Sequence, residues 1–174
     1  MKSIKPVLYI FSGLPGVGKS TLAKNIAKLL NAVYIRIDTI EQGLRDLCKF
    51  DVQGEGYRLA YKIVQDNLRV GNDVVADQCN PIKLTRGEWV YVAVKNNCDY
   101  VNIEIVCSDE SEHRKRVENR ENEIENMTLP TWQEITERKY DVWDEDRVII
   151  DTANRTVEEC TDELMKKINK RSEA

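Results

Sequence analysis

The sequence contains few of the residues that build metal and redox sites. Its 174 residues include one histidine, His113, and five scattered cysteines that form no Cys-x-x-Cys pair. Zinc sites and thiol redox centres usually need such pairs or clusters, so neither is predicted, and the odd cysteine count favours a reducing cytoplasm. Because His113 stands in a charged segment without a metal-ligand cluster or a nucleophile at a suitable spacing, we expect it at the surface.

Signals for membranes and export are also absent from the sequence. No apolar run approaches the length of about 20 residues that spans a bilayer. Residues 1–6 lead into an apolar stretch without the hydrophobic region or cleavage site of a signal peptide. We therefore expect a cytoplasmic protein that has no contact with a membrane.

Charge of one sign is not in large excess. The chain has 26 Lys and Arg against 30 Asp and Glu, for a formal net charge of −4. Without a basic field, broad binding of nucleic acid is not expected. The length, with no internal repeat or low-complexity linker, predicts a single domain over residues 1–174, whereas no feature predicts the oligomeric state.

The most specific motif is a glycine-rich stretch that matches G-x-x-x-x-G-K-[ST], the phosphate-binding P-loop. Backbone N–H groups and the positive end of the following helix attract the phosphates of a nucleoside triphosphate, here predicted to be ATP. Lys19 is expected to reach the outer phosphates, and the Ser20 hydroxyl to ligate Mg²⁺. The residues predicted to bind the nucleotide are Gly13, Leu14, Pro15, Gly16, Val17, Gly18, Lys19, Ser20 and Thr21.

The segments on either side of this motif support its assignment. Residues 7–11 are typical of a buried parallel strand, and residues 21–30 place Leu22, Ile26 and Leu29 on one helical stripe. A glycine-rich turn could precede an ordinary helix by chance. The strand–loop–helix order favours the nucleotide site instead.

Strands that alternate with helices along the chain predict an α/β fold. A parallel sheet would be covered by helices on both faces, in three layers. Further strands are predicted over 32–38, 73–77, 100–107 and 147–151, and helices over 39–48, 56–70, 84–97, 109–120, 132–139 and from a capping box at Thr156. The mixed polarity of residues 32–38 suits an edge strand. Ligands bind beyond the carboxyl ends of such strands, so the P-loop, Asp38 and Asp77 should share one rim.

Two aspartates at the ends of predicted strands are candidates for chemistry. Asp38 could accept the proton of a substrate hydroxyl that attacks the γ-phosphate of ATP. Its alternative is a structural role, because Asp38–Glu41 also matches a D-x-x-E capping pattern. Asp77 ends a short apolar run, as a Walker B aspartate does, and is predicted to hold Mg²⁺ together with Ser20; it could instead cap the next turn.

A pair of arginines lies in the charged segment predicted as a helix over 109–120. Arg116 and Arg120 are four residues apart and therefore share a helical face, from which they could bind a transferring phosphoryl group. The interleaved glutamates are equally typical of a solvated helix. Since the following residues are polar and loop-like, the pair could belong to a mobile helical lid over approximately 109–130.

Four more side chains have two interpretations each. Arg86 could bind substrate or lie on a helix surface. Trp132, Tyr140 and Trp143 could line a pocket for an aromatic or sugar ring, or pack in the core.

With these motifs in place, the chain resembles the small P-loop kinases often labelled AAA family ATPases. The group includes zeta toxins, chloramphenicol phosphotransferases, gluconate and adenylylsulfate kinases, and the kinase domain of phage polynucleotide kinase. The resemblance rests on the P-loop and on the segments Ile37–Ile40, Val74–Asn80, Arg116–Arg120 and Ile150–Thr152.

The resemblance implies a five-stranded parallel sheet in the order 2-3-1-4-5. It also implies that Asp38 is the catalytic base and that Arg116 and Arg120 contact phosphates. The loop after the last strand, with Arg155, would lie near the adenine. Residues 38–70, which should bind the phosphoryl acceptor, match no single member of the group.

The function that these features favour is an ATP-dependent kinase acting on a hydroxyl of a small-molecule or nucleotide-like acceptor. Alternatives are a polynucleotide 5′-kinase, a toxin-like nucleotide-sugar kinase and a regulatory nucleotide-binding protein without activity. A GTPase switch is disfavoured because Asn96–Asp99 lacks the lysine of N-K-x-D. A ring-forming motor is disfavoured because Gln78 replaces the glutamate after the Walker B aspartate.

Overall fold

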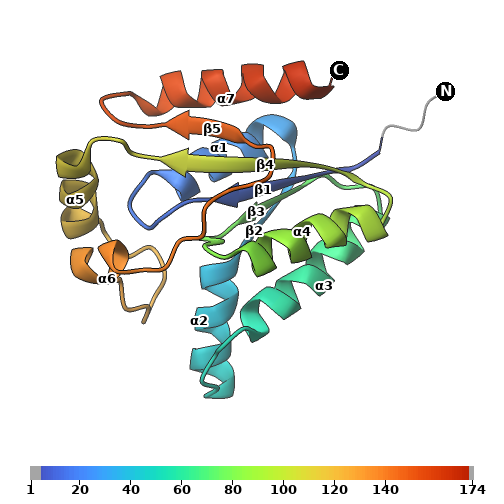
Figure 1. The fold of residues 1–174 in the computed structure, drawn as a ribbon. Coiled ribbons are helices and arrows are strands. Elements are labelled where there is room, and N and C mark those ends of the chain that lie inside the picture. The colour runs from blue at the N-terminus through green and yellow to red at the C-terminus, as the bar shows by residue number, and fades with distance from the viewer. Residues whose placement is uncertain (1–4, 173–174) are drawn as a thin grey trace.

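A computed structural model describes residues 5–172 as a five-stranded parallel sheet with helices on both faces (Figure 1). The strand order β2-β3-β1-β4-β5 confirms the predicted order, with β2 at an edge. The strands are β1 (Val7–Ser12), β2 (Val33–Arg36), β3 (Val74–Asp77), β4 (Asp99–Val106) and β5 (Val148–Asp151). The helices are α1 (Lys19–Leu30), α2 (Ile37–Cys48), α3 (Glu55–Arg69), α4 (Lys83–Lys95), α5 (Glu110–Asn119), α6 (Trp132–Thr136) and α7 (Val157–Ser172).

The central strand β1 shows how the three layers are held together. Leu8 and Ile10 point to the face that α3 and α4 cover, whereas Tyr9 and Phe11 point to the face covered by α1 and α7. All four side chains are at most 4% exposed. Because successive side chains of a strand alternate between faces, an unbroken apolar run is stable only with helices on both sides.

The second strand is shorter than the predicted 32–38. β2 ends at Arg36, and α2 begins at Ile37 without an intervening loop. Ile37 and Ile40 lie three residues apart and both pack into the core beneath the sheet, as the same face of a helix does. Asp38 consequently lies in the first turn of α2, whose N-cap residue is Arg36. The interpretation of Asp38 as a capping residue is therefore wrong.

Two capping boxes lie elsewhere. The predicted one at Thr156 is confirmed, since Thr156 and Glu159 exchange side-chain-to-backbone hydrogen bonds at the start of α7. A second, formed by Thr131 and Glu134, starts α6. This helix ends at Thr136, three residues before the predicted end of the 132–139 segment.

Residues 1–4 and 173–174 lie outside the described range. Most of residues 1–6, the segment in which no signal peptide is predicted, therefore also lies outside it. Within residues 5–172, none of the helices has the length and apolar character needed to span a bilayer.

Candidate active site

The P-loop connects β1 to α1 and has a backbone that requires its glycines. Gly13, Gly16 and Gly18 have φ angles of +145°, +87° and +89°, a region that residues with a Cβ rarely adopt. A Cβ on Gly13 would also lie 2.4 Å from the carbonyl oxygen of Ile105. Because α1 begins at Lys19, the unpaired N–H groups of its first turn adjoin the loop. The loop can therefore bind an anion through its backbone.

A buried ion pair joins the P-loop to the end of β3. The Lys19 Nζ lies 2.8 Å from Asp77 Oδ1, and the Tyr34 hydroxyl donates to Asp77 Oδ2 at 2.6 Å. Burial alone would raise the pKa of Asp77, but the Lys19 charge and hydrogen bonds from Lys19, Tyr34 and Ser20 hold it below its ordinary value. The predicted neighbours Lys19, Ser20 and Asp77 are thus brought together, with Asp77 ionised.

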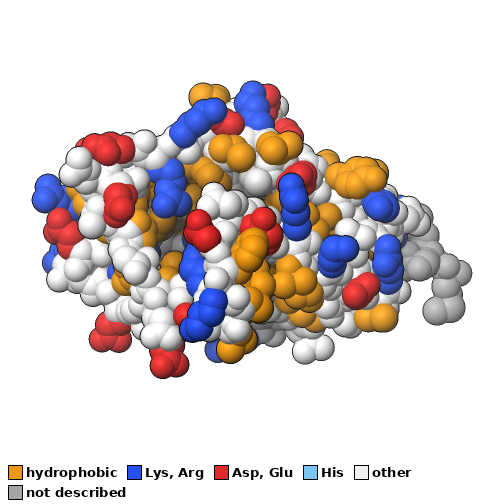
Figure 2. All heavy atoms as spheres, turned by 90° about the horizontal axis from the view of Figure 1, so that it is seen from below, with side chains coloured by type: hydrophobic (Ala, Val, Ile, Leu, Met, Phe, Trp, Pro, Cys, Tyr) orange, Lys and Arg blue, Asp and Glu red, His pale blue; other side chains and the backbone are white. Residues whose placement is uncertain are grey.

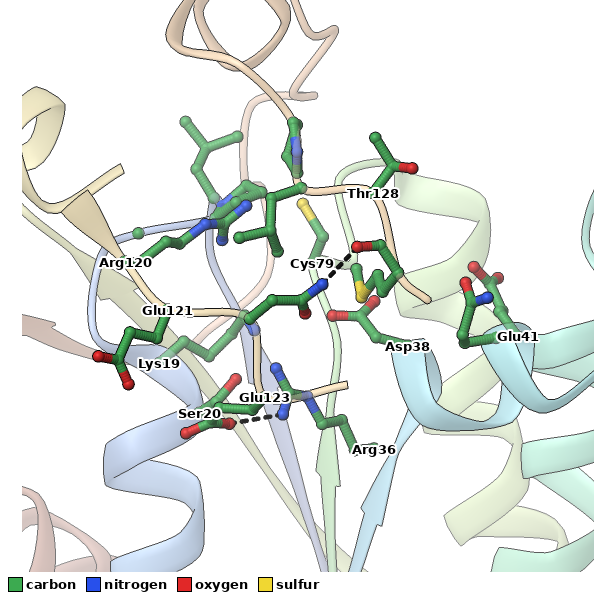
Figure 3. A pocket seen from close by; sticks show the side chains of 18 of the residues that line it. Lys19, Ser20, Arg36, Asp38, Glu41, Cys79, Arg120, Glu121, Glu123 and Thr128 are labelled. Atoms are coloured by element: carbon green, nitrogen blue, oxygen red, sulfur yellow. Dashed lines mark hydrogen bonds and ion pairs between the residues drawn. The ribbon is translucent and has the colours of Figure 1, made fainter. Parts of the chain in front are cut away.

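A cavity of about 850 Å³ lies between the P-loop, the start of α2 and the connection over residues 120–131. Every predicted P-loop residue except Val17 lines it. Asp38, Glu41 and Arg45 also line it, because they project from α2 at a spacing of three to four residues and so share a face. Figure 3 shows the Asp38 carboxylate directed into this cavity, on the side opposite α1.

The two predicted lid arginines have different surroundings. Arg116 donates to Thr152 Oγ1 at 2.8 Å and to the Thr152 carbonyl at 3.0 Å, and it pairs with Glu112. Arg120 has no hydrogen-bond partner for its buried Nε and Nη2 atoms. Burial, with the like charges of Arg36 and Arg138, lowers the pKa of Arg120, which Asp38 partly offsets. The helix α5 ends at Asn119 and the Arg120 backbone is extended, so the prediction that the two arginines share a helical face is wrong. Both nevertheless line the cavity, so a purely solvated helix face does not describe them.

His113 is buried, and its predicted surface position is wrong. It is 7% exposed, its Nε2 lies 2.8 Å from the carbonyl oxygen of Pro15, and its ring packs edge-on against Trp132. A carbonyl only accepts, so Nε2 donates. The hydrogen bond from His113 to Pro15 therefore helps to fix the conformation of the P-loop. Its spacing of four residues from Val117, the other buried residue of α5, is the sequence signal that could have placed it.

Arg86 and two of the aromatic residues lie outside the cavity. Arg86 is 1% exposed and donates to the carbonyl groups of Asn80, Pro81 and Asp141. Its guanidinium packs against the rings of Tyr140 and Trp143. This cluster anchors the chain before β5, so neither the substrate nor the helix-surface interpretation of Arg86 holds.

Arg155 is also outside the cavity. It donates to the carbonyl group of Asp151 and pairs with Glu163 on α7. Thr152, in the same loop, lies closer to the P-loop, where its hydroxyl is 2.9 Å from the Val17 carbonyl oxygen. The predicted contact of Arg155 with a nucleotide stays a prediction.

The connection over residues 120–131 is tied to the P-loop side by one carboxylate. Glu123 Oε2 lies 2.7 Å from Lys24 Nζ on α1 and 2.8 Å from Arg36 Nη1 at the end of β2 (Figure 3). Side chains from three separate segments therefore meet at the rim of the cavity.

We expect Glu123→Gln to loosen this connection without harming the fold. Glu123 is about half exposed, so the loss of stability should be below about 1 kcal/mol, whereas residues 120–131 should exchange amide hydrogens faster. Hydrogen exchange followed by mass spectrometry measures this, with Glu125→Gln as a control in the same connection. Equal exchange rates in the wild type and Glu123→Gln would show that the contact does not hold the segment.

The comparisons with known proteins agree with this geometry. A family model described as AAA domain matches residues 8–140, which is most of the chain. The chain belongs to the AAA domain family.

Solved structures with the same fold include several kinases. A gluconokinase from Sinorhizobium meliloti 1021 has a TM-score of 0.70 at 18% identity, over 97% of this chain and 94% of that one. The Mycobacterium tuberculosis APS kinase CysC in complex with AMPPNP and APS has a TM-score of 0.71 at 17% identity, over 95% and 98%. Chaetomium thermophilum Kti12 in complex with ADP-AlF3 has a TM-score of 0.66 at 18% identity, over 91% and 97%. The fold is thus that of small P-loop kinases.

Proposed function

We propose that this chain is an ATP-dependent kinase that transfers the γ-phosphoryl group to a hydroxyl of a small-molecule acceptor. One observation carries the proposal: the Asp38 carboxylate faces the same cavity as Lys19 and Ser20 of the P-loop. A site that only binds a nucleotide needs the P-loop but has no need of a carboxylate across from it. The names of the structural neighbours, a gluconokinase and an APS kinase, are consistent with a small acceptor.

The donor half of the site would consist of the P-loop and its neighbours. Backbone N–H groups would bind the phosphates, and the Lys19 ammonium would turn from Asp77 toward the outer ones. The adjacent oxygens of Ser20 and Asp77 fit Mg²⁺, which takes few protein ligands when substrate phosphates supply others. When bound, this ion would supply neutralisation of the phosphate charge.

The acceptor half would be centred on Asp38. Its carboxylate would take the proton of the attacking hydroxyl as the acceptor oxygen bonds to the γ-phosphorus and the bond to ADP breaks. Arg120, whose Nε and Nη2 are unpaired among the described residues, would donate to the transferring group. Arg116 would hold α5 against Thr152 and face the phosphates beside Gly18.

The alternatives differ from this proposal in the acceptor. A polynucleotide 5′-kinase would need a basic path for its substrate, yet Lys and Arg are interspersed with acidic and apolar side chains on the face shown in Figure 2. The formal net charge of −4 also argues against such a path. A regulatory nucleotide-binding protein would leave the position of Asp38 without a purpose.

Radiolabelled ATP tests the proposal directly. The protein is incubated with [γ-³²P]ATP, Mg²⁺ and either a deproteinised metabolite extract or an oligonucleotide with a free 5′-hydroxyl. We expect label in a small metabolite, which mass spectrometry then identifies, and little effect of salt on the transfer. Label on the oligonucleotide with steep salt dependence would favour the polynucleotide kinase, and ATP binding without transfer would favour the regulatory protein.

A further inference from the structure

The half of the cavity away from the P-loop has a distinctive lining. It consists of one face of α2, Cys79 after β3, residues 128–130 and Arg138 after α6. Among residues 5–172, no aromatic side chain lines the cavity. Aromatic residues near the cavity pack elsewhere: Tyr140 and Trp143 against Arg86, and Trp132 against His113. Tyr57, which lies near Cys79 and Glu41, packs edge-on against Tyr61, and its hydroxyl accepts from the Asn80 N–H. Bases and other aromatic ligands are commonly held by stacking on aromatic rings, and this lining offers no such ring.

The same lining is rich in arginine, and most of its cations are already paired. Lys19 pairs with Asp77, Arg36 with Glu123, Arg45 with Glu41 and Arg116 with Glu112. Arg120 and Arg138 differ: within the described range, neither has a carboxylate oxygen within 4.0 Å of a guanidinium nitrogen. Two cations therefore face the cavity without an ion-pair partner. Arg120 is assigned above to the transferring phosphoryl group. Arg138 is therefore the cation whose ligand is still unassigned.

Arg138 lies on the acceptor side of the cavity. Its guanidinium is within hydrogen-bond reach of the Cys79 sulfur, and Asp38 and Cys79 line the same cavity as Arg138. Burial raises the pKa of the Cys79 thiol despite Lys19 and Arg138, so this group stays uncharged and does not neutralise Arg138. Glu134, four residues before Arg138, also lines the cavity, and its carboxylate accepts from the Thr131 backbone N–H at 2.7 Å and from the Thr131 hydroxyl. These hydrogen bonds lower the pKa of Glu134, and the Arg138 charge helps to lower it from beyond ion-pair distance.

Resting on the kinase function proposed above, we propose that the acceptor is a non-aromatic polyhydroxylated molecule that carries a carboxylate or phosphate group. Arg138 binds that anionic group, and Asp38 receives the proton of the hydroxyl that attacks the γ-phosphorus. A guanidinium forms two parallel hydrogen bonds to a carboxylate or phosphate, which would fix the orientation of a small flexible acceptor. Hydroxyl groups would find partners in Glu41, Gln42 and Thr128.

Matched acceptor pairs test this inference. Ribonate is compared with ribitol, gluconate with glucitol, and glycerol 3-phosphate with glycerol, and adenosine and cytidine represent aromatic acceptors. ADP release and the melting temperature with a non-hydrolysable ATP analogue are measured for each. We expect at least one anionic compound to be phosphorylated and to raise the melting temperature, and its neutral partner to do so much less.

Variants then locate the anionic group. Arg138→Gln should raise the KM for the anionic acceptor by about 10- to 100-fold, with a smaller change in kcat and no change in the KM for ATP. Lys139→Gln removes a neighbouring charge that pairs with Asp141 and does not line the cavity, so it should leave all three constants unchanged.

The outcomes separate this inference from the kinase proposal. Transfer only to neutral polyols or nucleosides would overturn the acceptor class and leave the kinase function intact. Binding of anionic polyols without any transfer would contradict the kinase function instead. Neither binding nor transfer with any anionic compound, or an unchanged acceptor KM in Arg138→Gln, would overturn the inference.

Discussion

Replacing Lys19 with alanine is expected to lower phosphoryl transfer by at least about 10²- to 10³-fold, because a cation aimed at the outer phosphates is lost. It should also destabilise the free protein by about 3 kcal/mol, since Asp77 is 1% exposed and would lose its closer ion-pair partner, keeping the more distant Arg36, whose Nε lies 4.0 Å away. Phosphoryl transfer is measured with labelled ATP, and stability by urea unfolding at neutral pH. The variant should remain folded at low temperature, where its activity can be compared.

A double variant separates these two losses. Lys19→Met with Asp77→Asn removes both charges, so most of the lost stability should return, whereas transfer should stay at least as low as in Lys19→Ala. Recovery of transfer in the double variant would contradict the role of Lys19. So would wild-type transfer by folded Lys19→Ala.

Asp38→Asn is expected to lower kcat by about 10²- to 10⁴-fold and to leave the affinity for ATP unchanged, because the amide cannot accept the hydroxyl proton. The free energy of unfolding should fall by no more than about 1 kcal/mol, since Asp38 is not the N-cap and only its charge near the start of α2 is lost. Single-turnover transfer, ATP-analogue titration and urea unfolding measure the three quantities. Asp66→Asn, which removes an exposed carboxylate on α3, is the matched control.

The opposite pattern would assign Asp38 a structural role. In that case transfer would persist in Asp38→Asn, and only the free energy of unfolding would fall. A loss of ATP affinity equal to the loss of rate would also contradict a role limited to proton transfer.

Local pattern predicted the P-loop and the strands of a parallel sheet, because each of these depends on residues close together in the chain. The strand order, which pairs distant segments, was implied only by the resemblance to small P-loop kinases. The glycines at positions 13, 16 and 18 have positive φ angles that few other residues tolerate. The apolar runs of β1 and β3 have no polar face, which only a sheet covered on both sides accommodates.

Contacts between distant segments account for what the sequence did not predict. His113 lies in a charged helix, where its spacing from Val117 is the one local sign of burial, and its hydrogen-bond partner Pro15, 98 residues away in the chain, is known only from the fold. The start of α2 was not predicted because Ile37 continues the alternation of apolar and polar residues along β2 and yet packs as a helical residue. The partners of Arg86, and the lack of an ion-pair partner for Arg138 within residues 5–172, likewise depend on segments that meet only in the fold.

The central claim is that the γ-phosphoryl group of ATP leaves this site on the oxygen of an acceptor hydroxyl. ATP labelled with ¹⁸O at the three non-bridging γ-oxygens tests it when the protein is supplied with a metabolite extract and the products are weighed by mass spectrometry. The account predicts a phosphate monoester that carries the three heavy oxygens and one light bridging oxygen from the acceptor, and that forms far more slowly with Asp38→Asn. Heavy oxygen found only in inorganic phosphate, or ATP bound but unchanged, would contradict the account.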